Sequence, residues 1–267
     1  MGIVAISQTY GSLGDETAQE LARALGYRFA DREIILQAAA EFGQGVRELE
    51  HVTEERPTFW ERLSGTRQRY LAFVEAVLFE LAVGDDVVLA GRGAPFSLQK
   101  VPHALRVRIS APKRLRAERL GLGVEGGLDA IRRSDGERGA RVQFLYHVDW
   151  NEPLLYDLVL STERLDVRGV VRLIGEALAT ERFRSTPESR AVVRDLGLAA
   201  RVRATLLQNP RTQELDLTVA CRDGVVVLSG RVAREEERAL AGTVTEGIAG
   251  AGQVRNEIVV MRTRSGV

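Results

Sequence analysis

Short apolar runs separated by helical patterns dominate the first two thirds of the chain. Residues 3–6 and 87–90 contain no polar side chain, and 158–160 form a third such run. These runs are typical of strands buried on both faces, whereas residues 105–110 alternate at period two. The pattern predicts an α/β fold, a parallel sheet covered by helices, with the alternating strand nearer an edge. The expected helices are 18–25, 34–42, 57–81 and 167–179.

A glycine-bearing turn joins the first apolar run to the first helix. Gly11 and Gly14 lie in the sequence Ser-Gln-Thr-Tyr-Gly-Ser-Leu-Gly. This is the layout of a phosphate-binding loop, because backbone N–H groups and the helix dipole converge on an anion there. The usual motif, G-x-x-x-x-G-K-S/T, has a lysine where this chain has Asp15, and the only lysines are Lys100 and Lys113. The loop is therefore either rebuilt or disabled.

The pattern changes after a short segment without periodicity. Residues 180–188 contain a proline and are interpreted as a linker. Beyond it, an Asp-Gly turn at 223–224 lies between two apolar stretches, which is a strong indication of a hairpin. These features predict a small α+β module near the lower size at which a core sustains itself. Its expected elements are helices at 199–207 and 234–248 and strands at 215–220, 225–229 and 254–261.

Composition narrows the function classes. The 37 Lys and Arg residues balance 37 Asp and Glu residues, so the overall charge does not indicate nucleic-acid or membrane-surface binding. Residues 106–141 are locally basic, which suits either a polyanionic small molecule or a solvated helical surface. Cys221 is alone and the 3 histidines are scattered, so we expect no disulfide within the chain and no metal cluster. Without a leader or a long apolar run, we expect a cytoplasmic protein with no transmembrane segment.

Five ordered stretches carry a resemblance. They are Ile-Ser-x-x-Tyr-Gly-Ser-x-Gly at 6–14, Leu-Gly-Tyr-x-Phe-x-Asp-Arg-Glu-Ile at 25–34, Ala-Gly-Arg-Gly-Ala at 90–94, Arg-x-x-Asp-x-Glu-Arg at 132–138 and Val-Asp-Trp-x-x-Pro-x-x-Tyr-Asp-Leu-Val-Leu at 148–160. Through these stretches, residues 3–179 resemble the cytidylate kinase-like family, a branch of the nucleoside monophosphate kinases.

A second resemblance covers the C-terminal part. Residues 195–261 resemble a BON domain through Asn209-Pro210, the strand Val-Val-Leu-Ser-Gly-Arg-Val and the ending Val-Arg-Asn-Glu-Ile-Val-Val. That family is associated with phospholipid or envelope binding, which implies a phospholipid or protein partner. Together the resemblances imply a P-loop kinase domain at 1–180, a linker at 181–192 and a BON-like domain at 193–263.

The first resemblance implies that the glycine loop holds the phosphates of ATP. Gly11, Ser12 and Gly14 are the matching residues, and the Thr17 hydroxyl is the implied ligand of the Mg²⁺ that accompanies ATP. Each residue has a structural alternative, a strand-to-helix turn for the loop and a helix cap for Thr17. A carboxylate at Asp15 facing phosphate at about 4 Å would cost about 4 kcal/mol at an effective dielectric of about 20. That cost disappears if the side chain points outward.

The resemblance also implies an acceptor site and a lid. Asp31, Arg32 and Arg92 match positions that hold the acceptor nucleotide, with Arg92 as a bidentate partner of its phosphate. A mobile lid would bring further guanidinium groups to the phosphate chain. The structural alternatives are a surface ion pair for residues 31 and 32 and a solvated helix face for the lid. With Arg92, the implied catalytic residues are Arg132 and Arg138, with Asp135 to orient them and Arg141 beside them.

Two hypotheses of function follow. The first is an ATP-dependent nucleoside monophosphate kinase that transfers a phosphoryl group to (d)CMP or a related acceptor. The alternative is a catalytically impaired nucleotide-binding scaffold or sensor that acts through the BON-like domain on a protein or phospholipid partner. The orientation of Asp15 separates them, because the loop has no lysine to neutralise phosphate.

Overall fold

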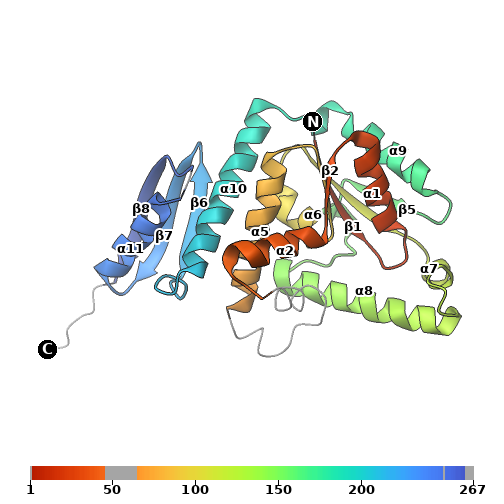
Figure 1. Ribbon diagram of the computed structural model, residues 1–267, viewed down its shortest axis with the longest axis horizontal. Helices are drawn as coiled ribbons and strands as arrows, with labels where there is room; N and C mark the ends of the chain where they lie inside the picture. Colours follow the sequence, from red (N-terminus) through yellow and green to blue (C-terminus); the bar gives the residue numbers. More distant parts are fainter. Residues whose placement is uncertain (1, 46–64, 249, 262–267) are drawn as a thin grey trace.

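A parallel sheet forms the centre of the first domain (Figure 1). The computed structural model describes residues 2–45, 65–248 and 250–261. The strands are β1 Ile3–Gln8, β2 Arg28–Ala30, β3 Val87–Ala90, β4 Ala104–Ser110 and β5 Leu158–Ser161. Their order is β2-β3-β1-β4-β5, and all neighbouring pairs are parallel. The sequence pattern missed β2, because three residues with a single buried side chain show no periodicity.

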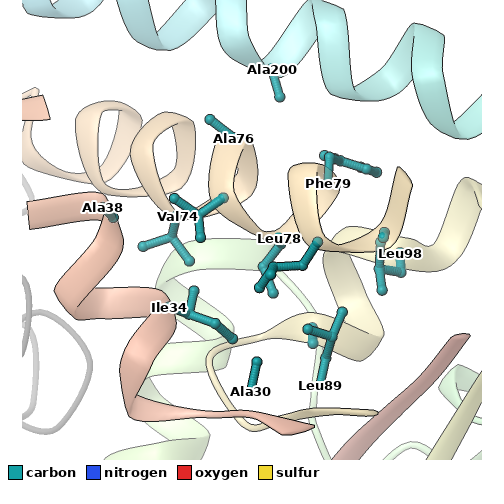
Figure 2. Packing of buried hydrophobic residues seen from close by; sticks show 14 of the residues in the cluster. Ala30, Ile34, Ala38, Val74, Ala76, Leu78, Phe79, Leu89, Leu98 and Ala200 are labelled. Atoms are coloured by element: carbon teal, nitrogen blue, oxygen red, sulfur yellow. The ribbon is translucent and has the colours of Figure 1, made fainter. Parts of the chain in front are cut away.

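Helices cover both faces of this sheet, as the sequence predicts. They are α1 Gly14–Leu25 and α9 Val167–Leu178 on one face, and α2 Arg32–Phe42 and α5 Thr66–Val83 on the other. Alternate side chains of β1 divide between two cores: Val4 packs with α1 and α9, and Ile3 packs with α2 and α5. Figure 2 shows part of the second core. The predicted helix at 57–81 overlaps α5, and residues 57–64 lie outside the described residues.

A long helix lies against the carboxyl ends of the strands (Figure 1). This helix, α8 Val124–Tyr146, follows the shorter α7 Lys113–Arg119. The two helices pack closely, because a Cβ at Gly127 would lie only 2.7 Å from the Ala117 carbonyl oxygen. The remaining short elements of this domain are α6 Ala94–Ser97, η1 Leu98–Lys100 and η2 Pro153–Leu155.

The alternating strand, β4, lies one strand in from the edge strand β5. Its polar positions are arginines that bind within the protein. Arg106 forms two side-chain hydrogen bonds with Asp157, and the Arg108 side chain is buried. The period-two pattern therefore reflects arginine side chains held by partners within the protein, with Arg108 buried and Arg106 partly exposed.

A small mixed sheet forms the C-terminal domain, as predicted. Strands β6 Leu217–Arg222 and β7 Val225–Val232 form the expected hairpin, and β8 Gln253–Val260 pairs in parallel with β7. Helix α11 spans Glu235–Glu246. No helix within the described ranges is long and apolar enough to cross a membrane.

The predicted linker is largely ordered secondary structure. It holds the short helix η3 Glu181–Phe183 and the start of α10 Pro187–Gln208, which begins well before the predicted residue 199. A capping box between Thr186 and Ser189 starts α10.

Helix α10 belongs to two cores. Its Val193 and Ala200 pack in the core of α5, and its Val202 and Leu206 pack in the core of the small sheet. Figure 2 shows Ala200 facing α5 near Ala76. The predicted linker at 181–192 between the two domains remains a prediction. Helix α10 makes hydrophobic contacts with both domains.

Candidate active site

A pocket of about 390 Å³ lies where β1 and β3 end. Ser7 and Gln8 line it from β1, Arg92 lines it after β3, and Arg138 and Arg141 line it from α8. Ligands of parallel α/β sheets bind at the carboxyl ends of the strands. The arginines make this pocket suitable for an anion, and aromatic side chains from α5, α6 and α8 complete its walls.

A left-handed turn carries Arg92 into the pocket. Gly91, Arg92 and Gly93 have φ angles of 66°, 51° and 75°. An arginine in this conformation costs on the order of 1 kcal/mol, and such strain is typical of functional sites. A Cβ at Gly93 would lie 2.0 Å from the Tyr146 hydroxyl, so the packing requires glycine. The turn places Arg92 Nε 3.3 Å from Asp31 Oδ1.

Three carboxylates, Asp15, Asp31 and Glu137, line the pocket with the arginines. Burial raises the pKa of Asp31, Arg92 lowers it, and the charge of Asp15 raises it further, with a net upward shift. Asp15 lines the pocket, and its Oδ1 accepts a 2.6 Å hydrogen bond from Gln8 Nε2. The side chain of Asp15 therefore points toward the pocket, which the sequence alone left open.

The raised pKa of Asp31 predicts a pH-dependent effect of Asp31→Asn. The folded state holds the Asp31 proton more tightly than the unfolded state, whose pKa is about 3.9. Stability is therefore lost as pH rises through the folded pKa, and Asp31→Asn removes that loss. Relative to the unmodified protein, the Tm of Asp31→Asn should rise as pH increases above about 4, the unfolded pKa, in thermal scans.

Asp157→Asn is the opposite-sign control. Burial would raise the pKa of Asp157, but the hydrogen bonds and charge of Arg106 lower it below its usual value. The Tm of Asp157→Asn relative to the unmodified protein should therefore fall as pH rises through the acid range toward about 4, the unfolded pKa, and stay constant above it. A pH-independent Tm difference for Asp31→Asn would contradict the proposed environment of Asp31.

Two guanidinium groups hold the glycine loop. Arg116 is 3% exposed, and it donates to the Tyr10 carbonyl at 3.1 Å and to the Ala111 carbonyl at 2.9 Å. Asp135 accepts from both of its terminal nitrogens, at 3.2 and 2.8 Å. Arg138 donates to the Gln8 carbonyl at 2.8 Å. The orienting role predicted for Asp135 thus involves a different arginine, Arg116.

The predicted loop residues lie together at the N-terminus of α1. Gly11 has a φ of 75°, and a Cβ at Gly14 would lie 2.2 Å from the Cβ of Gln8, so both positions favour glycine. The Ser12 hydroxyl is buried and donates to the Thr9 carbonyl at 2.7 Å. These residues shape the loop, and the first-turn N–H groups of α1 remain the donors suited to phosphate.

The environment of Thr17 does not fit a metal ligand. Its side chain is fully buried, and its hydroxyl donates to the Leu13 carbonyl at 2.6 Å. In the part of the chain that the structure describes, no group of three or more His, Cys, Asp or Glu side chains could hold a metal ion. The Mg²⁺ role of Thr17 stays a prediction, whereas the N–H donors of the loop are suited to the phosphates of ATP.

Several predicted residues do not line the pocket: Arg32, Arg132, Asp135 and the loop residues Gly11, Ser12, Gly14 and Thr17. Arg132 has a side chain that is 67% exposed and pairs with Asp129 on the same helix. Arg32 is exposed at the start of α2. The structure brings together the other predicted acceptor and lid residues, namely Asp31, Arg92, Arg138 and Arg141.

Sequence reasoning missed a buried arginine beneath the pocket. Arg108 donates to the Ser7 hydroxyl at 2.9 Å, and its guanidinium lies 3.8 Å from the Trp150 ring centre. Burial lowers its pKa. The alternation of apolar residues and arginines in β4 was the sequence feature that could have indicated Arg108. Trp150 and Tyr156 are buried with Phe96 in a small aromatic cluster.

Tyr70 is a second missed residue. It is 1% exposed and lines the pocket, and its hydroxyl has no hydrogen-bond partner among the described residues. Arg92 and Arg141 lie within electrostatic range of this hydroxyl. A buried donor without a protein partner is suited to a polar ligand atom. The largely apolar pattern of α5 gave no indication of this role.

Comparisons with known proteins agree with this architecture. The sequence model of the cytidylate kinase-like family matches residues 3–164, and that of the BON domain matches residues 194–262. The cytidylate kinase of Pyrococcus abyssi is 26% identical over 181 residues, which cover 66% of this chain and 93% of that enzyme. The cytidylate kinase of Methanothrix thermoacetophila is 28% identical over 172 residues, which cover 64% and 94%.

A solved structure shares the fold. An uncharacterized protein from Eubacterium ventriosum aligns with a TM-score of 0.52 at 18% sequence identity. The alignment covers 68% of this chain and 100% of that chain. At this identity, the similarity shows the fold alone.

Proposed function

This chain belongs to the cytidylate kinase-like family, and we propose that it is an ATP-dependent nucleoside monophosphate kinase with (d)CMP as acceptor. The observation that carries the proposal is the strained turn that holds Arg92 in a pocket beside the glycine loop. Phosphoryl transfer depends on positioning two anionic substrates and on stabilising the charge between them. An anion-binding loop and an arginine-lined pocket at one sheet edge meet both needs.

Each group has a defined task in this proposal. ATP supplies the phosphoryl group, and the loop and first-turn N–H groups of α1 hold its phosphates. Arg92 binds the phosphate of the acceptor, with the Tyr70 hydroxyl as a further donor. Arg138 lies between the two sites, because it lines the pocket and also donates to the carbonyl of Gln8, the last residue of β1 before the loop. It is therefore placed to stabilise charge that develops between the two substrates.

A coupled assay with ATP, Mg²⁺ and a panel of nucleoside monophosphates tests the proposal. We expect turnover with CMP and dCMP to exceed turnover with UMP and AMP. Isothermal titration with ATP, and separately with CMP, measures binding independently of turnover. The kinase proposal fails if neither nucleotide binds at millimolar concentration with Mg²⁺ present.

The impaired scaffold remains a second candidate because of Asp15. Its carboxylate faces the pocket at the position where the usual loop has a lysine. Binding of ATP and CMP without turnover would favour this candidate, with the BON domain acting on a protein or phospholipid partner.

Asp15→Asn tests whether this carboxylate weakens ATP binding. Asparagine keeps an acceptor for Gln8 and removes the negative charge. Because Asp15 is exposed, the repulsion is screened, and we expect the KM for ATP to fall by about tenfold. Steady-state kinetics at saturating CMP measure the change.

Glu16→Gln is the matched control for Asp15→Asn. Glu16 is an exposed acid in the same helical turn, but it does not line the pocket. Its replacement should change the KM for ATP less than twofold. An unchanged or higher KM in Asp15→Asn would show that the carboxylate does not repel ATP.

A further inference from the structure

A line of polar contacts joins α10 to the pocket. Arg203 Nη1 lies 3.2 Å from Glu75 Oε2. The Ser97 hydroxyl donates to Glu75 Oε1 at 3.3 Å, and Ser97 Oγ lies 3.2 Å from Tyr146 Oη. With the Ser97 proton directed at Glu75, the Tyr146 hydroxyl is the donor of that last bond. The contacts thus connect four helices: α10, α5, α6 and α8.

The Tyr146 hydroxyl, at the end of this line of contacts, packs against the turn that carries Arg92. A Cβ at Gly93 would lie 2.0 Å from the Tyr146 hydroxyl, so the hydroxyl rests directly against the turn. The Ser97 backbone N–H also donates to the Gly93 carbonyl at 3.0 Å. Tyr146 itself lines the pocket. A shift of this hydroxyl therefore changes the space available to the turn.

The first contact of the line differs from an ordinary surface ion pair. The Glu75 side chain is only 18% exposed. Burial raises the pKa of its carboxyl, and Arg203 and then Ser97 oppose that rise. Without Arg203, the carboxylate would keep Ser97 as its hydrogen-bond donor but lose its closest cation. A buried carboxylate in that position either takes up a proton or moves toward solvent, and both responses alter its bond to Ser97.

Arg203 lies in the segment of α10 that contacts both cores. Its neighbour Val202 is fully buried in the core of the small sheet, and Ala204 is fully buried in the core of α5. A change in the packing of the C-terminal domain therefore acts on the helical turn from which Arg203 reaches Glu75.

We propose that Arg203 is a positioning residue of the acceptor pocket, and that it holds the Arg92 turn through Glu75. Ser97 and Tyr146 carry the contact between them. The helix shared with the C-terminal domain thus contributes to acceptor binding. For the identity of the acceptor, this inference rests on the proposed function.

The first test compares Arg203→Met with Arg201→Met. Arg201 lies on the same helix and pairs with Glu41 and Glu80, away from the pocket. Arg203→Met should raise the KM for CMP about 5- to 10-fold and leave the KM for ATP within twofold. Arg201→Met should leave both within twofold. Arg203→Lys, which keeps a cation near Glu75, should restore part of the loss.

Ser97→Ala breaks the same line without touching α10. It should also raise the KM for CMP, and the double variant with Arg203→Met should be no worse than the more impaired single variant. Independent, multiplicative effects of the two substitutions would overturn the inference. Equal increases in the KM for CMP and for ATP would overturn it as well.

Amide hydrogen exchange of the nucleotide-free full chain tests the positioning directly. Peptides that cover residues 91–97 should exchange faster in Arg203→Met and Ser97→Ala than in Arg201→Met. This measurement tests the positioning role of Arg203 even if the protein does not bind CMP. Failure of the positioning role can therefore be distinguished from failure of the proposed kinase function. Equal exchange of these peptides in all three variants would overturn the positioning role.

Discussion

Arg92→Ala is expected to lower kcat/KM for CMP by about 10²- to 10³-fold. Its guanidinium lies in the pocket beside Asp31, and its side chain is 13% exposed. Removing one member of a desolvated, charge-assisted contact costs about 2–5 kcal/mol, and each 1.4 kcal/mol corresponds to about tenfold. Most of the loss should fall on CMP binding, measurable as weaker affinity by titration calorimetry. ATP affinity should change much less, because Arg92 follows β3, whereas the N–H donors proposed for ATP lie in the loop after β1 and in the first turn of α1.

Arg92→Lys and thermal unfolding serve as controls for this prediction. Lysine keeps the positive charge but not the bidentate geometry, so it should recover only part of the activity. Folding should be retained, because the left-handed conformation of residue 92 is unfavourable for arginine and alanine alike. Full activity in Arg92→Ala would remove the acceptor role of this turn, and equal losses of ATP and CMP affinity would indicate a general structural defect.

Arg116→Met is expected to reduce the free energy of unfolding by about 3–5 kcal/mol. The guanidinium is buried, and its removal takes donors from the Tyr10 and Ala111 carbonyls and from the Asp135 carboxylate. A chain of this size loses about 2–4 °C of Tm per kcal/mol, so the Tm should fall by about 10 °C. Thermal and urea unfolding both measure the effect.

The same variant should weaken ATP binding. The lost hydrogen bond to the Tyr10 carbonyl is one of the contacts that hold the glycine loop in place. Arg114→Met is the matched control, since Arg114 lies on the same helix, is 81% exposed and pairs only with Glu118 among the interactions described for it. It should change stability by less than about 0.5 kcal/mol. A loss below about 1 kcal/mol in Arg116→Met would mean that other groups hold the loop.

A double variant identifies the source of the destabilisation. Much of the expected loss comes from leaving Asp135 without its partner, so Arg116→Met combined with Asp135→Asn should be less destabilised than the sum of the single variants. Additive effects would show that the two side chains contribute independently.

The apolar pattern predicted the architecture because the burial of a strand is visible in its own consecutive residues. A strand buried on both faces needs uninterrupted apolar residues, and residues 3–6 and 87–90 satisfy this in β1 and β3. The glycines around Arg92 were recognised through the resemblance. The structure shows why glycine is required there: the turn is left-handed, and Gly93 packs against Tyr146. The start of α10 was missed although its capping sequence, Thr-Pro-Glu-Ser, is present, because residues 180–188 lack apolar periodicity and contain a proline, and the helical spacing of Val193, Leu196 and Ala200 was not used.

Sequence alone thus determined the parallel sheet, the small second domain and the glycine and arginine positions at the sheet edge. Only the tertiary structure decided that Asp15 points into the pocket, that Asp135 holds Arg116, and that Arg203 reaches Glu75. The physical reason is distance along the chain. Backbone conformation and burial pattern depend on near neighbours, whereas the partner of a charged side chain depends on which distant elements the fold places within a few ångströms of it.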